Sequence, residues 1–452
     1  MIALKSKSQT TFNLLRAYES PNVTFIEDGG AWPIVWERAR DVWVWDDRGK
    51  KYLDLTAGFG VAAAGHANPR VVKAGQAQME TLLHAMGDVH PHRLKAELAR
   101  KLSRITFERW SSPSNKPNSD PQSPPRITGK TIFCNSGFEA VEAALKTAML
   151  ATGKRGVIAF EQAYHGLGYG ALNATHRDYF RAPFRSQLGR FGQFVPFPVR
   201  IDHLKHIDIL LQDLFMHYPI GAVLVEPVQG RGGIHIPPPE FLRHLRALCD
   251  RQQALLILDE IYTGFGRTGR WFACEHFRII PDLVCLGKAL TGGFPLSACV
   301  GRAEVMDNAW PRSSGEAIHT STFLGHPVGC AMALAQAGEI RRRNLVERSE
   351  RLGNYLLTCL KQLPPPPNHR LAARGLGLMA GLEITSSDGA PATALVMEVI
   401  KEMLRRGFIL LPEGQHANVI SFTPPLTITR VQLRRTLEVL GEVLATGAGT
   451  PA

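Results

Sequence analysis

Short apolar runs recur through the middle of the chain, and polar residues, Gly or Pro bound each of them. The runs cover residues 131–134, 157–160, 222–225, 255–258 and 283–286. Uninterrupted runs of this length predict strands that are buried on both faces, as in a parallel sheet. Helical periodicity lies between several of them, for example over 140–148 and 239–252. Strands that alternate with helices predict a large, doubly wound, mostly parallel α/β sheet.

The pattern differs towards both ends of the chain. Between Trp32 and Leu55, alternating residues flank the turn Asp46-Asp47-Arg48-Gly49, which predicts a hairpin of a small antiparallel sheet. Beyond Gly325 a long helical stretch over 327–362 is broken by four prolines. A strand over 378–384 and helices over 392–406 and 430–444 then predict a second, smaller α/β unit.

These patterns predict three parts. Residues 1–75 form an N-terminal segment that belongs with the small domain, 76–328 form the large domain, and 329–452 form the C-terminal small domain. Residues 111–126 have no periodicity and are rich in Ser, Pro and Asn, which predicts an exposed insertion in the large domain.

Composition is typical of a soluble globular protein, with 44% hydrophobic and 20% charged residues among 452. No apolar run is long enough to span a bilayer. The formal charge is +12, but the basic residues are scattered and no nucleic-acid-binding motif accompanies them. An attraction for small anions fits this charge better.

Cysteine and histidine usage indicates the compartment and argues against a metal site. The seven cysteines form no CxxC pair, which favours reduced thiols. The first eighteen residues are basic but lack an apolar signal core, so the predicted location is the cytoplasm. The sixteen histidines show no spacing that would close a metal site.

Two of the predicted strands end in residues that carry chemistry. The run 255–258 leads to Asp259, and the run 283–286 leads to Lys288. In open α/β sheets, ligands bind beyond the carboxyl ends of the strands. A desolvated lysine forms Schiff bases, and a carboxylate keeps a pyridine nitrogen protonated, so the pair predicts pyridoxal phosphate. The alternatives are a solvated surface lysine and a structural aspartate cap.

Three further positions offer contacts to such a ligand. Asn135-Ser136-Gly137 opens a helix and predicts a phosphate site, to which hydroxyls at 320–323 add; a plain N-cap is the alternative. Tyr164-His165 offers a flat ring, and Arg374, before a Gly-x-Gly turn, offers a fork for a carboxylate. Taken alone, a Tyr-His pair of this kind is more often loop packing, and an arginine before a turn is more often an ordinary surface residue.

Seven segments of the chain resemble the motifs of a known protein family, and they occur in the same order as in that family. They are NSGFEAVEAALKTA, AYHG, VEPVQG, LDEIYTGFGRTG, LGKALTGG, STFLGHP and ARGLGLMAGLE. Together they resemble the class III pyridoxal-phosphate-dependent aminotransferases, which include ornithine, acetylornithine and 4-aminobutyrate aminotransferases. The resemblance covers roughly residues 30–440 and implies fold type I, the aspartate-aminotransferase-like fold.

The resemblance implies roles for individual residues. Lys288 would form the internal aldimine and shuttle the proton, while Asp259 would pair with the pyridine nitrogen. Ile261 and Tyr164 would cover the two ring faces. Ser136, Gly137 and Phe138 would hold the phosphate. The remaining implied contacts are His165, Glu226 and Tyr262 to the cofactor, Arg374 and Phe59 to the substrate, and Thr322 to the phosphate of a neighbouring subunit. Thr322 therefore implies a homodimer, with a tetramer as the alternative.

Three positions depart from the family pattern. Arg231 stands where many members have Glu, Tyr262 where many have Gln, and Phe138 where a small residue is usual. Our hypothesis is that Arg231 adds a cationic contact and favours substrates with an extra anionic group. An Arg231 that points away to solvent is the alternative.

The resemblance implies a ping-pong transfer of an amino group to a 2-oxo acid, either 2-oxoglutarate or pyruvate. The donor would be an amino acid or an ω-amine. The second hypothesis is an amino-acid racemase, epimerase or aminomutase on the same scaffold. A decarboxylase is a third hypothesis and is less favoured than the second. A non-enzymatic sensor that reuses the fold lacks support, because no DNA-binding segment is appended.

Overall fold

The computed structural model describes residues 7–27, 32–112 and 127–446. Within these ranges the largest sheet has seven strands in the order β4-β10-β9-β8-β7-β5-β6. Their bounds are β4 (Gly129–Cys134), β5 (Gly156–Phe160), β6 (Gly192–Val195), β7 (Ile220–Val225), β8 (Leu255–Asp259), β9 (Leu283–Leu286) and β10 (Ser297–Arg302). The neighbours from β9 to β6 are all parallel. The predicted α/β class is confirmed.

Two strands of this sheet were not predicted. The edge strand β6 is short and opens with Gly192-Gln193, and β10 consists mostly of small residues, so neither shows a clear apolar run. β10 lies antiparallel between β4 and β9, which makes the sheet mixed.

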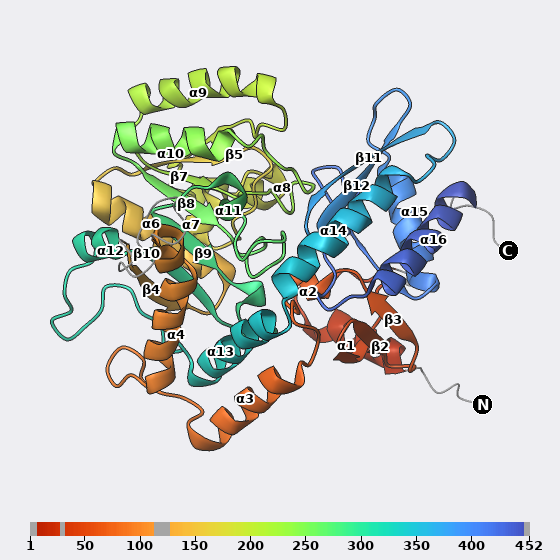
Figure 1. The fold of residues 1–452 in the computed structure, drawn as a ribbon, viewed down its shortest axis with the longest axis horizontal. Helices are drawn as coiled ribbons and strands as arrows, with labels where there is room; N and C mark the ends of the chain where they lie inside the picture. The colour runs from red at the N-terminus through yellow and green to blue at the C-terminus, as the bar shows by residue number, and fades with distance from the viewer. Residues whose placement is uncertain (1–6, 28–31, 113–126, 447–452) are drawn as a thin grey trace.

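Helices cover both faces of the large sheet, as Figure 1 shows. Alternate residues of one strand face opposite layers, as expected for a doubly wound sheet. Leu256 and Leu258 pack in the cluster that contains α10 (Phe241–Gln252) and α4 (Arg93–Ile105), whereas Ile257 packs with α6 (Gly137–Thr152). Other helices around this sheet are α5 (Phe107–Ser111), α7 (Tyr169–Leu172), α8 (Asp178–Arg181), α9 (Leu204–His217), α11 (Cys274–Phe277) and α12 (Ala303–Ala309).

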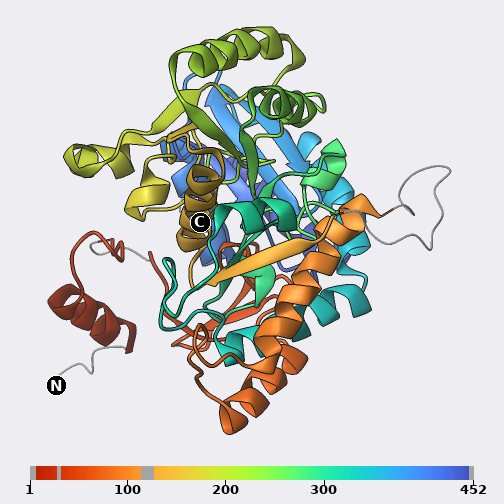
Figure 2. The same ribbon diagram turned by 90° about the vertical axis from the view of Figure 1, so that its left-hand side faces the viewer.

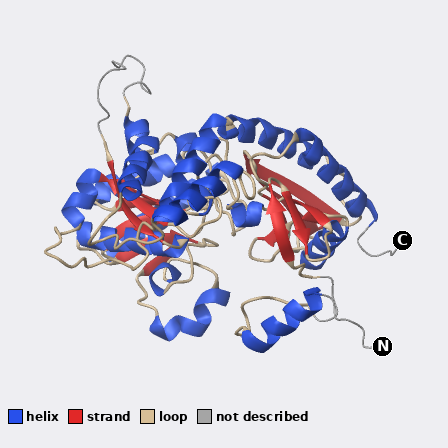
Figure 3. Ribbon diagram, turned by 90° about the horizontal axis from the view of Figure 1, so that it is seen from below, coloured by secondary structure: helices blue, strands red, loops and turns tan. Residues whose placement is uncertain are grey.

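Two smaller sheets lie in a second body beside the first (Figures 1 and 3). One joins β1 (Trp36–Arg40), β2 (Trp43–Asp46) and β3 (Lys51–Asp54) to β13 (Phe408–Ile409). β2 and β3 form the predicted antiparallel hairpin. Because β13 pairs with β3, the N-terminal strands share a sheet with residues from near the C-terminus. The domain limits after 75 and 328 remain a prediction.

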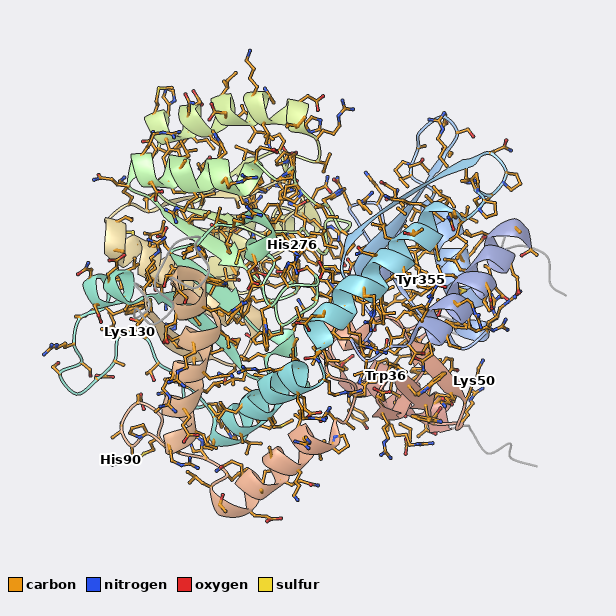
Figure 4. All side chains as sticks on the ribbon, viewed as in Figure 1. Trp36, Lys50, His90, Lys130, His276 and Tyr355 are labelled. Atoms are coloured by element: carbon orange, nitrogen blue, oxygen red, sulfur yellow. The ribbon has the colours of Figure 1, made fainter. Side chains whose placement is uncertain are left out.

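The other small sheet has the order β11-β12-β15-β14 and is antiparallel. Its strands are β11 (His369–Leu376), β12 (Met379–Ser386), β14 (Leu411–Glu413) and β15 (Val419–Phe422). The helices α14 (Leu345–Lys361), α15 (Thr393–Arg405) and α16 (Arg430–Thr446) belong to the same body (Figure 1). Tyr355 of α14, labelled in Figure 4, lies in this body, and the guanidinium of Arg430 lies 4.5 Å from its ring centre.

Some predicted elements have different limits in the structure. The helical stretch 327–362 is two helices, α13 (Pro327–Arg342) and α14, because Asn344 adopts a left-handed φ of 49° between them. The predicted insertion at 111–126 lies outside the described residues from position 113 onward.

The remaining N-terminal helices are α1 (Lys7–Tyr18), which stands at the edge of the molecule in Figure 2, α2 (Ala57–Gly60) and α3 (Pro69–Thr81). None of the helices in the described ranges is long and apolar enough to cross a membrane.

Candidate active site

Asp259 and Lys288 meet at one edge of the large sheet. Asp259 ends β8, and Lys288 follows the neighbouring parallel strand β9 after a single glycine. Lys288 opens a short 3-10 turn with a left-handed φ of 41°. This conformation is costly for a residue with a Cβ, which is typical of a functional site.

The amine of Lys288 is tuned by its surroundings. Burial lowers the pKa of Lys288, and the nearby carboxylates of Asp259, Glu226 and Glu413 oppose that shift. The Lys288 Nζ lies 4.4 Å from the ring centre of Tyr262. A lysine with a lowered pKa is neutral, and therefore nucleophilic, at a lower pH than a solvated one.

Asp259 is held by two hydrogen bonds and is only 5% exposed. Its Oδ1 accepts from the Ile261 N–H at 3.1 Å, and its Oδ2 lies 2.8 Å from the Nδ1 of the buried His165. An ionised carboxylate only accepts hydrogen bonds, so the Nδ1 of His165 carries the proton in this pair. His165 therefore orients Asp259.

Glu226 follows β7 and joins two loops of the site. Its Oε1 accepts from the Tyr164 N–H at 3.0 Å, and its Oε2 accepts from the Gly230 N–H at 2.9 Å. Burial raises the pKa of Glu226, and the neighbouring His165 acts in the opposite direction. Glu226 thus sets the positions of Tyr164 and of Arg231, the residue after Gly230.

The start of α6 offers an anion site. Ser136 occupies the N-cap position of this helix but makes no capping bond, and its buried Oγ has no hydrogen-bond partner among the described residues. Its carbonyl accepts from the Ser297 Oγ at 2.6 Å, which fixes the backbone. Free N–H groups and the positive helix end favour a phosphate here. A Cβ added to Gly137 would lie 3.1 Å from the Cδ1 of Ile261, so Ile261 lies directly beside this turn.

Phe138, one of the departures from the family pattern, has a packing explanation. A Cβ added to Gly166 would lie 2.3 Å from the Cβ of Phe138, and one added to Gly168 would lie 2.4 Å from its Cδ2. The loop that carries Tyr164 and His165 therefore passes over the Phe138 ring, and only glycine allows that approach.

Tyr262, a second departure, fills a narrow slot beside Lys288. A Cβ on Gly60 or Gly230 would lie 2.6 Å or 2.4 Å from its ring atoms. Its hydroxyl lies 3.1 Å from the Oγ1 of Thr423, and burial raises its pKa to about 12. Tyr262 is thus a neutral side chain that restricts the space around the lysine.

Arg231, the third departure, is tied into the site. Its Nε lies 3.7 Å from the Oε2 of Glu413, and its guanidinium carbon lies 4.9 Å from the ring centre of Tyr164. The alternative in which Arg231 only faces solvent does not hold, although the side chain is 39% exposed.

The predicted role of Arg374 is not supported. Arg374 lies inside β11, opposite Gly381, three residues before the turn that joins β11 to β12. Its Nε donates to the Gly233 carbonyl at 2.9 Å, its Nη2 to the same carbonyl at 2.6 Å, and its Nη1 to the Glu383 Oε2 at 2.6 Å. With all three guanidinium nitrogens engaged, Arg374 connects β11 to the loop after Gly230 instead of offering a free fork to a carboxylate.

Two predicted contacts lie on the surface of the single chain. Thr322 is exposed, and Phe59 is 60% exposed on the irregular turn α2. Gly60, the next residue, approaches Lys288, since a Cβ added to it would lie 3.9 Å from the Lys288 Cδ. Their roles in substrate and subunit contacts remain predictions.

Glu413 and Arg177 are charged neighbours that the sequence did not reveal. Glu413 ends the three-residue strand β14, and Arg177 precedes the short helix α8. Neither stands in a motif, so only their proximity to Arg231 in space identifies them.

The residues at this edge fit pyridoxal phosphate. Ser136 provides an unpartnered buried hydroxyl at a helix start for the phosphate. Lys288 provides an amine with a lowered pKa for the aldehyde. Asp259 provides an oriented carboxylate for the pyridine nitrogen. No cluster of His, Cys, Asp or Glu suited to a metal occurs in the part of the chain that the structure describes.

Comparison with known proteins agrees with this chemistry. Residues 26–444 match the family model of the class III aminotransferases. The acetylornithine aminotransferase of Methanosarcina acetivorans is 36% identical over 91% of this chain and 92% of its own. The 5-aminovalerate aminotransferase of Pseudomonas aeruginosa is 35% identical over 91% and 93%.

Solved structures show the same fold over nearly the whole chain. The ornithine aminotransferase of Toxoplasma gondii superposes with a TM-score of 0.81 at 27% identity, covering 98% of this chain and 96% of that one. A PLP-bound amine transaminase from an uncultivated Pseudomonas species gives 0.83 at 26% identity, with 95% and 98% covered. This chain belongs to the class III aminotransferases, enzymes that depend on pyridoxal phosphate.

Proposed function

We propose that this chain moves an amino group from an amino acid or an ω-amine to a 2-oxo acid, with Lys288 as the residue that carries the cofactor and transfers the proton. One observation supports this proposal above the others. The amine of Lys288, with its lowered pKa, lies at the same sheet edge as the Asp259–His165 pair.

The cofactor, when bound, supplies an electron sink for the pair of electrons that a departing proton leaves behind. The neutral Nζ of Lys288 takes that proton from the carbon that bears the amino group and later returns it. The carboxylate of Asp259, oriented by His165, keeps the proton on the pyridine nitrogen. Ile261 and Tyr164 restrict the ring from its two faces.

The phosphate contacts follow from the start of α6. The Ser136 hydroxyl and the N–H groups of Gly137 and Phe138 bind the phosphate at the positive helix end. Thr322 reaches the phosphate of the other subunit in a homodimer. Phe59 forms part of the pocket wall.

A surface feature supports the homodimer. Large apolar side chains are exposed on two adjacent segments and amount to a contact surface. They are Leu82 (40% exposed), Leu83 (59%), Met86 (53%), Val89 (59%) and Phe323 (54%). The segments touch, because Thr320 donates to Asp88 and the His84 ring lies 5.5 Å from that of Phe323. Thr322 lies within this surface.

The names of the relatives suggest which donors to test first. Acetylornithine and 5-aminovalerate carry an amino group at the end of a carbon chain, so ω-amino acids head the panel, followed by α-amino acids. The acceptors are 2-oxoglutarate and pyruvate. We also propose a reducing, cytoplasmic location, supported by seven free cysteines, all within the described ranges.

Incubation of the holoenzyme with one donor and no acceptor tests the reaction. Transamination converts the cofactor to its amino form, seen by absorbance, and releases one equivalent of carbonyl product. Deuterium exchange with inverted configuration and no carbonyl product, for every donor, would identify a racemase instead and refute the proposal.

A further inference from the structure

A basic cavity lies between α4 and α13, two helices that pack against each other (Figure 1). Its volume is about 470 Å³, and none of its lining residues belongs to the site around Lys288. Four cationic side chains line it, three from α4 and one from the last turn of α13. They are Arg100, Lys101, Arg104 and Arg341.

These four cations have no acidic partner. Within the described ranges none of them forms an ion pair with a carboxylate. The acid that lines the same cavity, Glu97, pairs with Arg93 one turn earlier on α4. A fifth lining cation, Arg109, is engaged with Glu275 and so has its charge balanced. The basic cavity therefore keeps four positive charges that no side chain offsets.

The arrangement on α4 costs stability in the absence of a bound anion. Arg104 follows Arg100 by four residues and Lys101 by three, and like charges at these spacings destabilise a helix. Burial lowers the pKa of Lys101, and the nearby Arg341 and Arg104 lower it further. A cation is favourable in the last turn of a helix, which accounts for Arg104 and Arg341. Arg100 and Lys101 lie before that turn, so the helix end does not explain them.

The rest of the wall is apolar and aromatic. It consists of Ile105, Leu334 and the half-buried ring of Trp271. A cavity of this volume lies within the range of small-molecule sites, about 300–1,000 Å³. The basic cavity thus combines room for a small molecule with cations on two different walls.

The placement of the cations favours a phosphoryl group over a carboxylate. The three terminal oxygens of a phosphoryl group point in three directions, so one group can accept from α4 and from α13 at the same time. A carboxylate is planar and accepts in one plane. Guanidinium groups match phosphate oxygens in a bidentate geometry, and a lysine adds a point charge.

We propose that the basic cavity binds a small anion with two or more linked phosphoryl groups. A single phosphate carries about 1.5 to 2 negative charges at neutral pH, so two linked groups balance the four cations better than one. The anion is either free pyrophosphate or the diphosphate of a nucleoside, whose base would lie against Trp271. The site is separate from the phosphate site at α6, and the proposal does not depend on the aminotransferase reaction.

Pyrophosphate is the first probe, with orthophosphate, citrate and ADP as comparisons. Binding is measured by calorimetry on the holoenzyme, because the cofactor then fills the phosphate site at α6. The buffer contains no divalent metal, and the ionic strength is the same for every probe, since salt screens exposed charges.

We expect pyrophosphate to bind at least roughly tenfold more tightly than orthophosphate or citrate, because it accepts more charge-assisted bonds from the two walls. Arg100→Gln, Lys101→Gln and Arg341→Gln should each weaken pyrophosphate binding by roughly tenfold. Arg100→Gln and Lys101→Gln should not lower the melting temperature of the enzyme without pyrophosphate, because each removes a repulsion. A residue with a purely structural role would show the opposite pattern.

ADP distinguishes the two sources of the phosphoryl groups. Tighter binding of ADP than of pyrophosphate would identify a nucleoside diphosphate as the ligand class, and Trp271→Leu should then remove the difference, since base stacking on an aromatic ring is lost. ADP that binds no more tightly than pyrophosphate would identify the free anion. Both results support the proposal.

Arg342→Gln is the matched control. Arg342 follows Arg341 on α13 but does not line the cavity, and its Nε and Nη2 donate to Glu339 at 2.8 Å and 2.9 Å. The substitution removes the same charge from the neighbouring position, so pyrophosphate binding should stay unchanged. The proposal is overturned if pyrophosphate does not bind, or if orthophosphate or citrate binds as tightly. Equal weakening by Arg342→Gln and Lys101→Gln would also overturn it, because only a general attraction for anions would remain.

Discussion

At the scale of single residues, burial and a few neighbouring side chains determine the pKa values and the positions of the ionisable groups in the site. Lys288 has a lowered pKa, Glu413 a raised one, and Asp259 is held by His165. A lowered lysine pKa means that the neutral amine, the form that attacks an aldehyde, is present at lower pH than in a solvated lysine.

Replacing Lys288 should therefore remove turnover. We expect Lys288→Ala to lower kcat by at least about 10³-fold, because it removes both the anchoring amine and the proton-transfer base. Carbonyl release under saturating donor measures this, with circular dichroism to verify the fold. A Lys288→Ala protein that turns over at the normal rate would show that the site has been misassigned.

The lowered pKa of Lys288 also predicts a pH profile for the cofactor-free protein. Trapping of pyridoxal phosphate by borohydride, followed by peptide mapping, should label Lys288 first at pH 8. Labelling should fall as the pH drops below the lowered pKa, because the amine becomes protonated. Equal labelling of exposed lysines at pH 8 would contradict this expectation.

Asp259 is expected to act on the cofactor's electronic state rather than on folding. Asp259→Asn keeps the shape but loses the charge, so kcat should fall on the order of 10²-fold and the absorbance of the bound cofactor should shift. Asp282→Asn is the control: Asp282 is buried on the same sheet, and its Oδ2 accepts from Leu256 N–H at 2.7 Å and from Arg246. That variant should lose stability with an unchanged spectrum.

At the scale of elements, the start of α6 is expected to contribute to cofactor affinity but not to the stability of the fold. The Ser136 Oγ has no protein partner, so Ser136→Ala should leave the melting temperature of the cofactor-free protein unchanged or slightly higher. Cofactor affinity should nevertheless fall by roughly tenfold, as for a lost hydrogen bond to a charged group. Fluorescence titration with pyridoxal phosphate measures the Kd.

Ser103→Ala provides the opposite pattern. The Ser103 Oγ donates to Glu108 at 2.6 Å and accepts from the Gly129 N–H at 2.9 Å, so its removal should lower the melting temperature. Its cofactor affinity should stay normal. If Ser136→Ala also lost stability without losing affinity, Ser136 would be a helix cap only.

The slot between α2 and the loop after β7 is a second element-scale feature. Gly230→Ala would place a Cβ 2.4 Å from the Tyr262 ring, and overpacking of this kind costs about 1–3 kcal/mol. In a Tyr262→Ala background the same substitution should cost close to nothing. A double-mutant cycle by chemical denaturation measures the difference, and additive effects would disprove the contact.

At the scale of the whole molecule, the proposed homodimer predicts complementation. Two inactive chains, Lys288→Ala and Thr322→Arg, should regain part of the activity when refolded together. The reason is that a mixed dimer has one site with an intact Lys288 and an intact Thr322 from its neighbour. Sedimentation of each variant controls for loss of assembly. Activity that stays at the sum of the separate variants would refute the shared site.

The sequence by itself determined most of the large sheet and predicted the centre of the site, because both depend on local patterns. Strand runs that end in Asp259 and Lys288 predict one shared sheet edge, and Ser136 before a helical pattern predicts an anion site. Strand β10, made mostly of small residues, lacked such a pattern, and its place between β4 and β9 depends on pairing across the sheet.

The roles of charged residues that stand in no clear motif were decided only by the tertiary structure. Arg374 resembled a substrate-binding residue in sequence, but long-range bonds to Gly233 and to Glu383 occupy its guanidinium. Glu413 stood in no motif, yet folding buries it beside Arg231 and Lys288. A charge acts according to its neighbours and its exposure to water, and in this chain those neighbours lie far away in sequence.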